Sequence, residues 1–299
     1  MRLGLRKKGL ALVITVAAGK GGTGKTLVAV NLALSMQRAG TETLLADADV
    51  EEPNDHLFVK PSISRRDEVT IPVPHIDDRL CDRCGECSSF CAYGALATTP
   101  DRVLLFDDLC HGCGGCMLVC PAGAITERER VIGVIERGDT AEGMGFMRGI
   151  LEIGEPKASP IISAMKRRLD PGAANVVDCG PGTGCAAMTT VQGSDICLMV
   201  TEPTPFGLHD LLMAVRMAEA LGVPSLVVVN KDVPGEGEVR RFCAEHGLEI
   251  ALSIPFSLEI ARLTSRGTNL VDADDEWRRL FYSLYERIAP MARSGGDLR

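Results

Sequence analysis

Short apolar runs, each long enough for one buried strand, recur along most of this chain. Leu10 to Ala17 is a β-branched run that ends near a glycine, and Thr43 to Ala46 is a second run that ends at Asp47. Apolar runs of this length predict buried strands. Further strands are expected at Ala174 to Val177, Ile196 to Thr201 and Ser225 to Asn230.

Segments of helical length lie between these strands. We expect one helix from Thr26 to Ala39, with Gly40 as its C-terminal stop, and another from Leu208 to Leu221. Strands that alternate with helices predict an α/β fold, a doubly wound and mostly parallel sheet.

The alternation breaks in the second quarter of the chain. Eight of the twelve cysteines fall there, in two similar blocks from Cys81 to Cys91 and from Cys110 to Cys120. Because the α/β pattern resumes afterwards, the cysteine segment is expected to be an insertion. The predicted domains are a discontinuous main domain of residues 1–61 and 131–299, and an inserted module of residues 62–130.

The entry to the insertion is polar and contains prolines. Ser64 to Glu68 is a polar stretch, and Pro72 and Pro74 follow it. Such residues are typical of linkers, so we expect a linker here.

Composition narrows the class of protein. Hydrophobic residues make up 45% and charged residues 24%, which is typical of a globular protein. The formal net charge of −8 argues against a broad electrostatic surface for nucleic acid.

A glycine-rich motif follows the first predicted strand and opens the first predicted helix. Its residues are Gly19, Lys20, Gly21, Gly22, Thr23, Gly24, Lys25 and Thr26, and they match the P-loop pattern. Backbone N–H groups of such a loop surround phosphate oxygens. Lys25 is expected to reach the β- and γ-phosphates of ATP, and the Thr26 hydroxyl to ligate Mg²⁺.

The N-terminus superficially resembles a secretory signal. Arg2, Arg6, Lys7 and Lys8 precede the apolar run from Leu10 to Ala18. That run leads directly into the phosphate loop, so cleavage there would destroy the motif. We therefore expect a cytoplasmic protein, whose cysteines in a reducing compartment are metal ligands rather than disulfides.

The two cysteine blocks have the same spacing, with two, two and three residues between cysteines. This is the spacing of two-cluster bacterial ferredoxins, in which the fourth cysteine of each block ligates the other cluster. The bacterial-ferredoxin-like module is thus expected to bind two 4Fe-4S clusters. One would be held by Cys81, Cys84, Cys87 and Cys120, and the other by Cys110, Cys113, Cys116 and Cys91.

Two four-cysteine zinc sites are the competing interpretation. Zinc sites usually have a longer spacer between cysteine pairs than this dense arrangement allows. The cluster interpretation is therefore preferred.

Lys20, a second lysine inside the phosphate loop, gives this chain its family resemblance. The loop resembles the deviant Walker A motif of the MinD, ParA, Mrp and nitrogenase iron-protein superfamily of P-loop ATPases, and the resemblance covers nearly all of the chain outside the insertion. It implies a homodimer across the nucleotide, in which Lys20 contacts phosphates bound to the neighbouring subunit. It also implies ATP hydrolysis that is slow and stimulated by a partner.

The same resemblance assigns further residues. Asp49 resembles the switch I aspartate, which orients or deprotonates the attacking water, and Asp47 would support the magnesium shell. Asp178 resembles the Walker B aspartate beside Mg²⁺, and Gly180 to Gly184 the γ-phosphate-sensing switch II loop. Asn230 resembles the purine-contacting asparagine; the alternative is a strand-end asparagine that caps a turn.

Two further features have simple alternatives. Cys185 lies seven positions after Asp178, where the nitrogenase iron protein has a ligand of its subunit-bridging cluster, but the second cysteine that such a cluster needs is missing.

Trp277, Phe281 and Ile288 follow helical spacing, as in the membrane helix of MinD. We expect this helix to pack on the sheet instead, so membrane binding is not predicted.

The leading functional hypothesis is an ATPase whose nucleotide-driven homodimer switch is coupled to two 4Fe-4S clusters. Its partner would be a redox protein or a metalloenzyme client, served by electron transfer or by maturation. The alternatives are an ATP-gated carrier of iron-sulfur clusters, or a MinD/ParA-like positioning ATPase with structural clusters.

Overall fold

The computed structural model describes residues 12–233 and 237–294. The expectations for Arg2, Arg6, Lys7, Lys8 and the start of the first strand at Leu10 lie outside these residues.

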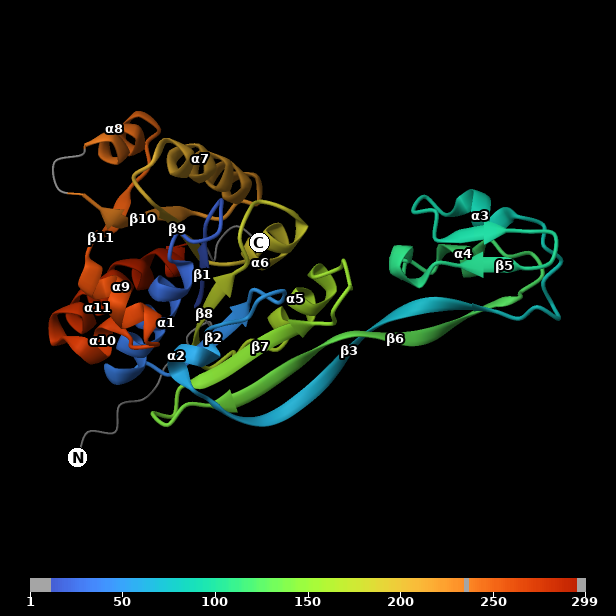
Figure 1. The fold of residues 1–299 in the computed structure, drawn as a ribbon, viewed down its shortest axis with the longest axis horizontal. Helices are drawn as coiled ribbons and strands as arrows, with labels where there is room; N and C mark the ends of the chain where they lie inside the picture. The colour runs from blue at the N-terminus through green and yellow to red at the C-terminus, as the bar shows by residue number, and fades with distance from the viewer. Residues whose placement is uncertain (1–11, 234–236, 295–299) are drawn as a thin grey trace.

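Within the described residues, nine strands form one sheet at the centre of the main domain (Figure 1). The strands from β11 to β7 run parallel, and β6 and β3 join antiparallel at one edge. The predicted doubly wound, mostly parallel sheet is confirmed. In sheet order the strands are β11 (Ile250–Pro255), β10 (Ser225–Asp232), β9 (Ile196–Thr201), β1 (Val13–Ala17), β8 (Ala174–Cys179), β2 (Thr43–Ala48), β7 (Gly145–Leu151), β6 (Ile125–Asp139) and β3 (Ser62–Ile76).

Helices cover both faces of the sheet because successive strand residues point to opposite sides. In β9, Leu198 and Val200 pack under the helices of one face, and Cys197 and Met199 under those of the other. The first face carries α1 (Lys25–Arg38), α2 (His56–Val59), α9 (Leu258–Ser265), α10 (Leu270–Ala273) and α11 (Asp275–Ser294). The second carries α5 (Ser159–Lys166), α6 (Cys185–Val191), α7 (Pro205–Ala220) and α8 (Glu238–Glu245).

Helix α7 begins three residues earlier than the apolar pattern predicted. Thr204 caps it, since its Oγ1 accepts a hydrogen bond from the Gly207 N–H at 3.0 Å. Pro205 then occupies the first turn, where its missing N–H has no helical partner to lose.

The predicted linker was wrong, because Ser64 to Glu68 and the two prolines lie within strand β3. β3 pairs with β6 in antiparallel register from Ser62 and Asp139 to Ile76 and Ile125. Proline is tolerated there because β3 is an edge strand, whose second side needs no ladder hydrogen bonds. The two strands continue beyond the sheet as a long ribbon (Figure 1).

The cysteine module lies at the far end of this ribbon (Figure 1). Its small core contains Cys87, Leu96, Val103 and Ile125. The module comprises α3 (Glu86–Phe90), β4 (Leu96–Thr98), β5 (Val103–Leu105), the 3₁₀ helix η1 (Asp107–Leu109) and α4 (Gly115–Leu118).

The C-terminal helix α11 packs on one face of the sheet, as expected, and lies beside α1. Phe281, Leu284 and Ile288 are buried in the same apolar cluster as the inner side of α1. Among the described residues, no helix is long and apolar enough to cross a membrane.

Replacing Phe281 by alanine should destabilise the main domain by about 3–5 kcal/mol, because the ring is fully buried and would leave a cavity. Thermal and denaturant unfolding measure the loss. Glu286→Ala on the exposed side of the same helix is the control, and an equal effect of both substitutions would contradict this packing.

Candidate functional site

The phosphate loop connects β1 to α1 and is shaped by glycine. Gly22 and Gly24 have φ of 74° and 97°, a region that side chains rarely adopt. Gly19 is required for another reason, because a Cβ there would collide with the backbone of Asp210. The loop therefore has the curled backbone that a phosphate site needs.

Thr26 and Asp178 meet at the start of α1. The Thr26 hydroxyl donates a hydrogen bond to Asp178 Oδ2 at 2.7 Å. The other oxygen of Asp178, Oδ1, is buried and has no hydrogen-bond partner among the described residues. The expected magnesium ligands thus lie together, with one carboxylate oxygen unused.

Asp47 lies next to Asp178 because β2 and β8 are neighbouring parallel strands in which these residues are in register. Its oxygens accept backbone N–H groups from Asp49 at 3.2 Å, from Asn54 at 2.8 Å and from Asp55 at 3.0 Å. Asp47 therefore organises the loop that follows β2.

Asp55 is a site residue that sequence reasoning missed. Its side chain is fully buried, and neither oxygen has a hydrogen-bond partner within the described chain. The only sequence signal is its place at the end of an acidic stretch, and such stretches are usually solvated.

Three buried carboxylates repel one another at this edge of the sheet. Burial and the charge of Asp178 raise the pKa of Asp47 to about 8. Burial raises the pKa of Asp178 to about 6, and burial with the nearby Asp47 raises that of Asp55 well above its ordinary value. Unused oxygens and excess negative charge fit a divalent cation held partly through water. In the described residues, no three acidic, histidine or cysteine side chains are arranged to hold a metal ion directly.

Asp49 lies between the phosphate loop and the loop that follows β8. A Cβ on Gly180 would be 3.3 Å from Asp49 Oδ1, so the two loops are in close contact. Burial raises the pKa of Asp49, and the positive charge of Lys25 opposes that rise. The neighbouring Glu51 and Glu52 are exposed to solvent.

Glu202, at the end of β9, is a second residue that the sequence did not reveal. Its Oε1 accepts a hydrogen bond from Lys20 Nζ at 2.5 Å, and its Oε2 one from Lys231 Nζ at 3.0 Å. Lys231 Nζ also donates to the Gly22 carbonyl at 3.1 Å. The hydrogen bond from Lys20 lowers the pKa of Glu202. Lys20 is thus paired within its own chain.

Asn230 supports the phosphate loop. Its Nδ2 donates to the Thr23 carbonyl at 2.8 Å, and its Oδ1 accepts the Lys231 N–H at 2.9 Å. These bonds favour the alternative in which Asn230 stabilises local backbone. The purine contact stays a prediction.

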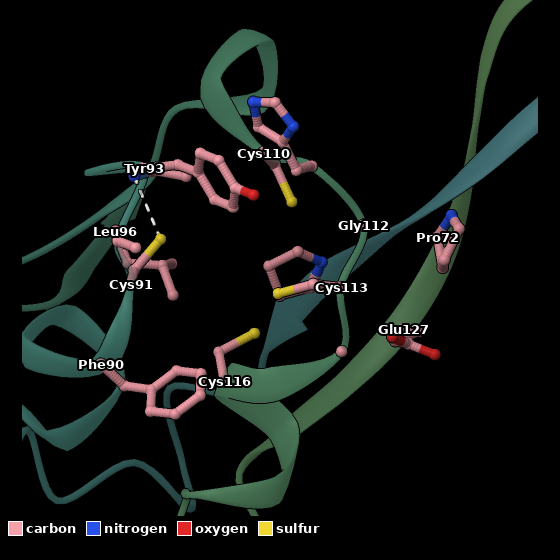
Figure 2. Close-up of a pocket in the computed structure, with 15 residues that line it drawn as sticks. Pro72, Phe90, Cys91, Tyr93, Leu96, Cys110, Gly112, Cys113, Cys116 and Glu127 are labelled. Atoms are coloured by element: carbon pink, nitrogen blue, oxygen red, sulfur yellow. Dashed lines mark hydrogen bonds between the residues drawn. The ribbon is translucent and has the colours of Figure 1, made fainter. Parts of the chain in front are cut away.

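The module gathers the cysteines in the two crossed sets that the spacing predicts. Figure 2 shows the proximal set, Cys91, Cys110, Cys113 and Cys116, with its sulfur atoms pointing into one shared space. The cavity they line has a volume of about 150 Å³. The distal set, Cys81, Cys84, Cys87 and Cys120, lines a narrower cavity of about 10 Å³.

The backbone has the same local features around both cysteine sets. Gly85 and Gly114 have φ of 83° and 71° and precede the short helices α3 and α4. The Ala95 N–H donates to Cys91 Sγ at 3.4 Å, and the Ala124 N–H to Cys120 Sγ at 3.3 Å. N–H groups directed at sulfur stabilise thiolates, so the donor sets fit iron-sulfur clusters.

The remaining cysteines lie apart from these cavities. Cys179, Cys197 and Cys243 are buried, and Cys185 is exposed at the start of α6. His111, beside Cys110, stacks on Tyr93 with ring centroids 3.7 Å apart.

Comparisons with known proteins agree with this geometry. Residues 14–271 match the CobQ/CobB/MinD/ParA nucleotide binding domain. An uncharacterized protein of Methanocaldococcus jannaschii is 30% identical over 282 residues, covering 94% of this chain and 97% of that protein. An iron-sulfur cluster carrier protein of Aquifex aeolicus is 25% identical over 318 residues, covering 97% of this chain and 71% of that protein. The Pyrococcus furiosus cell division ATPase MinD superimposes with a TM-score of 0.58 at 18% identity, covering 94% of this chain and 100% of that structure.

The buried carboxylates predict a pH dependence for metal-free protein. Because folding raises the pKa of Asp47 to about 8, its contribution to stability is present below pH 4 and lost as the pH rises through 8. In EDTA, the unfolding temperature should therefore fall over this window, and less so in Asp47→Asn. Scanning fluorimetry measures the unfolding temperature of both proteins as a function of pH. An equal fall in the two proteins would contradict this contribution of Asp47.

The crossed cysteine sets predict a pattern of iron loss. Cys91→Ala and Cys120→Ala should each lower the iron content by about half, because each removes one cluster. Adding Cys113→Ala to Cys91→Ala should remove no more iron, whereas adding Cys84→Ala should remove nearly all of it. Cys243→Ala is the control. If adding Cys84→Ala to Cys91→Ala removed no more iron, and adding Cys113→Ala removed nearly all of it, the ligation would not be crossed.

Proposed function

The chain belongs to the CobQ/CobB/MinD/ParA family of nucleotide-binding domains, and on this basis we propose that it is an ATPase coupled to two 4Fe-4S clusters. The observation that carries the proposal is the presence, in one chain, of a phosphate loop beside buried carboxylates and of two crossed sets of four thiols.

The main domain supplies the groups for ATP hydrolysis. Lys25 and the backbone of the phosphate loop bind the phosphates, and Thr26 and Asp178 hold Mg²⁺, which when bound neutralises phosphate charge. Asp49 is half-buried beside both Lys25 and the Gly180 loop. It orients the attacking water or accepts its proton.

A homodimer would complete the site. In the single chain Lys20 is neutralised by Glu202 at 2.5 Å. To reach phosphates bound to a second copy, Lys20 must leave this carboxylate, and the γ-phosphate is the anion that replaces it. ATP would then favour the dimer, and hydrolysis would return Lys20 to Glu202.

The module holds the clusters through its eight cysteines, and bound clusters supply one-electron redox chemistry. The nucleotide site is close in sequence to the start of the ribbon that carries the module. α2 ends at Val59, only four residues after the buried Asp55, and β3 begins at Ser62. A rearrangement of the Asp47–Asp55 loop is therefore transmitted to the start of the ribbon. We assign the clusters to electron transfer or to maturation of a metalloenzyme.

A second candidate is an ATP-gated carrier of iron-sulfur clusters. It is favoured by the names of relatives, such as the carrier proteins of Aquifex aeolicus and Haemophilus influenzae. The crossed ligation argues against it, because release of either cluster would need movement of both cysteine blocks.

An EPR-monitored redox titration of anaerobically prepared protein, with and without Mg-ATP, separates the candidates. A nucleotide-dependent shift in potential or spectrum supports coupled redox function. Clusters that are unchanged by nucleotide but pass to an apo-ferredoxin in the presence of ATP support the carrier function instead.

Asp49→Asn should lower kcat for ATP hydrolysis by about 10²-fold or more while Mg-ATP still binds, because the substitution removes the group that activates water. Phosphate release and fluorescent-nucleotide binding measure the two effects. Glu52→Gln, an exposed change in the same turn, should leave both unchanged. Equal kcat in the two variants would exclude this role for Asp49.

A further inference from the structure

A buried charged group joins the main domain to the module near the proximal cysteine set. It lies in the loop between β7 and α5, which faces the near edge of the module (Figure 1). Lys157 Nζ donates to the Asp108 carbonyl at 2.7 Å and to Glu155 Oε1 at 2.9 Å. The Lys157 side chain is only 10% exposed and that of Glu155 only 2%.

The ribbon joins the same group. Arg130, on β6, pairs with Glu155 Oε2 at 2.7 Å, and its side chain is 18% exposed. Burial opposes ionisation of Glu155, but the hydrogen bond from Lys157 and the positive charge of Arg130 lower its pKa. One buried carboxylate thus binds a cation of the ribbon and a cation that reaches into the module.

The carbonyl that Lys157 contacts lies two residues before Cys110, one of the four proximal thiols. Cys110 itself is buried in an apolar cluster with Val73 of β3 and Ala158 of the main domain. The position of Cys110 therefore depends on contacts from outside the module.

The other end of the same segment leads to the nucleotide site. Lys166, the last residue of α5, donates to the carbonyls of Thr189 at 2.9 Å and Thr190 at 3.1 Å, near the end of α6. α6 begins at Cys185, directly after the Gly180–Gly184 loop that contacts Asp49. Packed contacts therefore run from this loop through α6 and α5 to Lys157.

We propose that Glu155, Lys157 and Arg130 form a strut that positions the Cys110 loop on the main domain and transmits the nucleotide state to the proximal cysteine set. The second half of this statement rests on the proposed coupling of ATP to the clusters. The strut acts as a unit because removing one partner of a buried ion pair leaves the others uncompensated.

The test is hydrogen exchange of residues 107–113 in the full-length, cluster-loaded protein under anaerobic conditions, with no nucleotide, Mg-ADP or Mg-ATP. Lys157→Met should speed exchange there by about tenfold in the nucleotide-free protein and abolish any difference between nucleotide states. Lys157→Arg should restore wild-type behaviour. Arg216→Met, which removes an exposed cation on α7, is the control.

The possible outcomes distinguish the positioning of the Cys110 loop by the strut from the transmission of the nucleotide state. Unchanged exchange in Lys157→Met without nucleotide overturns the strut, whatever nucleotide does. Faster exchange in that variant, with no nucleotide effect in the wild-type protein, retains the positioning role and overturns the coupling. Faster exchange over the whole module, rather than at residues 107–113, marks general unfolding and also overturns the strut.

Discussion

Burial of negative charge at the carboxyl edge of the sheet is the constraint on which the nucleotide site depends. Parallel register places Asp47 beside Asp178, and the chain brings Asp55 back onto the same point. Mutual repulsion would make this arrangement unfavourable on its own. The loop after β2 is folded around Asp47 through three backbone N–H groups, so the carboxylates shape the site even before a cation binds.

The same edge shows how opposite charge is distributed. Lys25 is close enough to the buried Asp178 that its positive charge opposes the rise that burial causes in the pKa of that carboxyl. Lys20 and Lys231 are paired instead with Glu202, which is not one of the three buried carboxylates. A cation that must act on another subunit is better held on a partly exposed carboxylate than on a fully buried one, because less desolvated charge has to be separated. The placement of Glu202 is therefore consistent with a lysine that changes partners.

Motifs formed by residues close together in the sequence could be predicted, whereas contacts between residues far apart in the sequence could not. The phosphate loop and the cysteine spacing are chemical patterns within a few residues. The predicted start of α7 was three residues late because the apolar pattern does not include its cap, Thr204, or Pro205. The role of Glu202 depends on Lys20, 182 residues away, and that of Lys157 on a carbonyl 49 residues away. The prolines of β3 indicated a linker because edge position is a property of the whole sheet, which composition does not report.

The two cysteine sets differ in their relation to the main domain. The proximal cavity is lined by Pro72 and Glu127 of the ribbon, and Gly112 packs so closely on Pro72 that a Cβ would not fit. The distal cavity is lined instead by Ile76 and Ile125, the last pair of the ribbon.

Two connections from the main domain reach the proximal set. One is the covalent path from the Asp55 loop into β3, and the other is the strut at Lys157. The ribbon continues past the proximal set to Ile76 and Ile125 at the distal cavity, whereas the strut contacts the Cys110 loop. Under the proposed coupling, the strut therefore acts on the proximal set, and the main domain reaches the distal set through the ribbon.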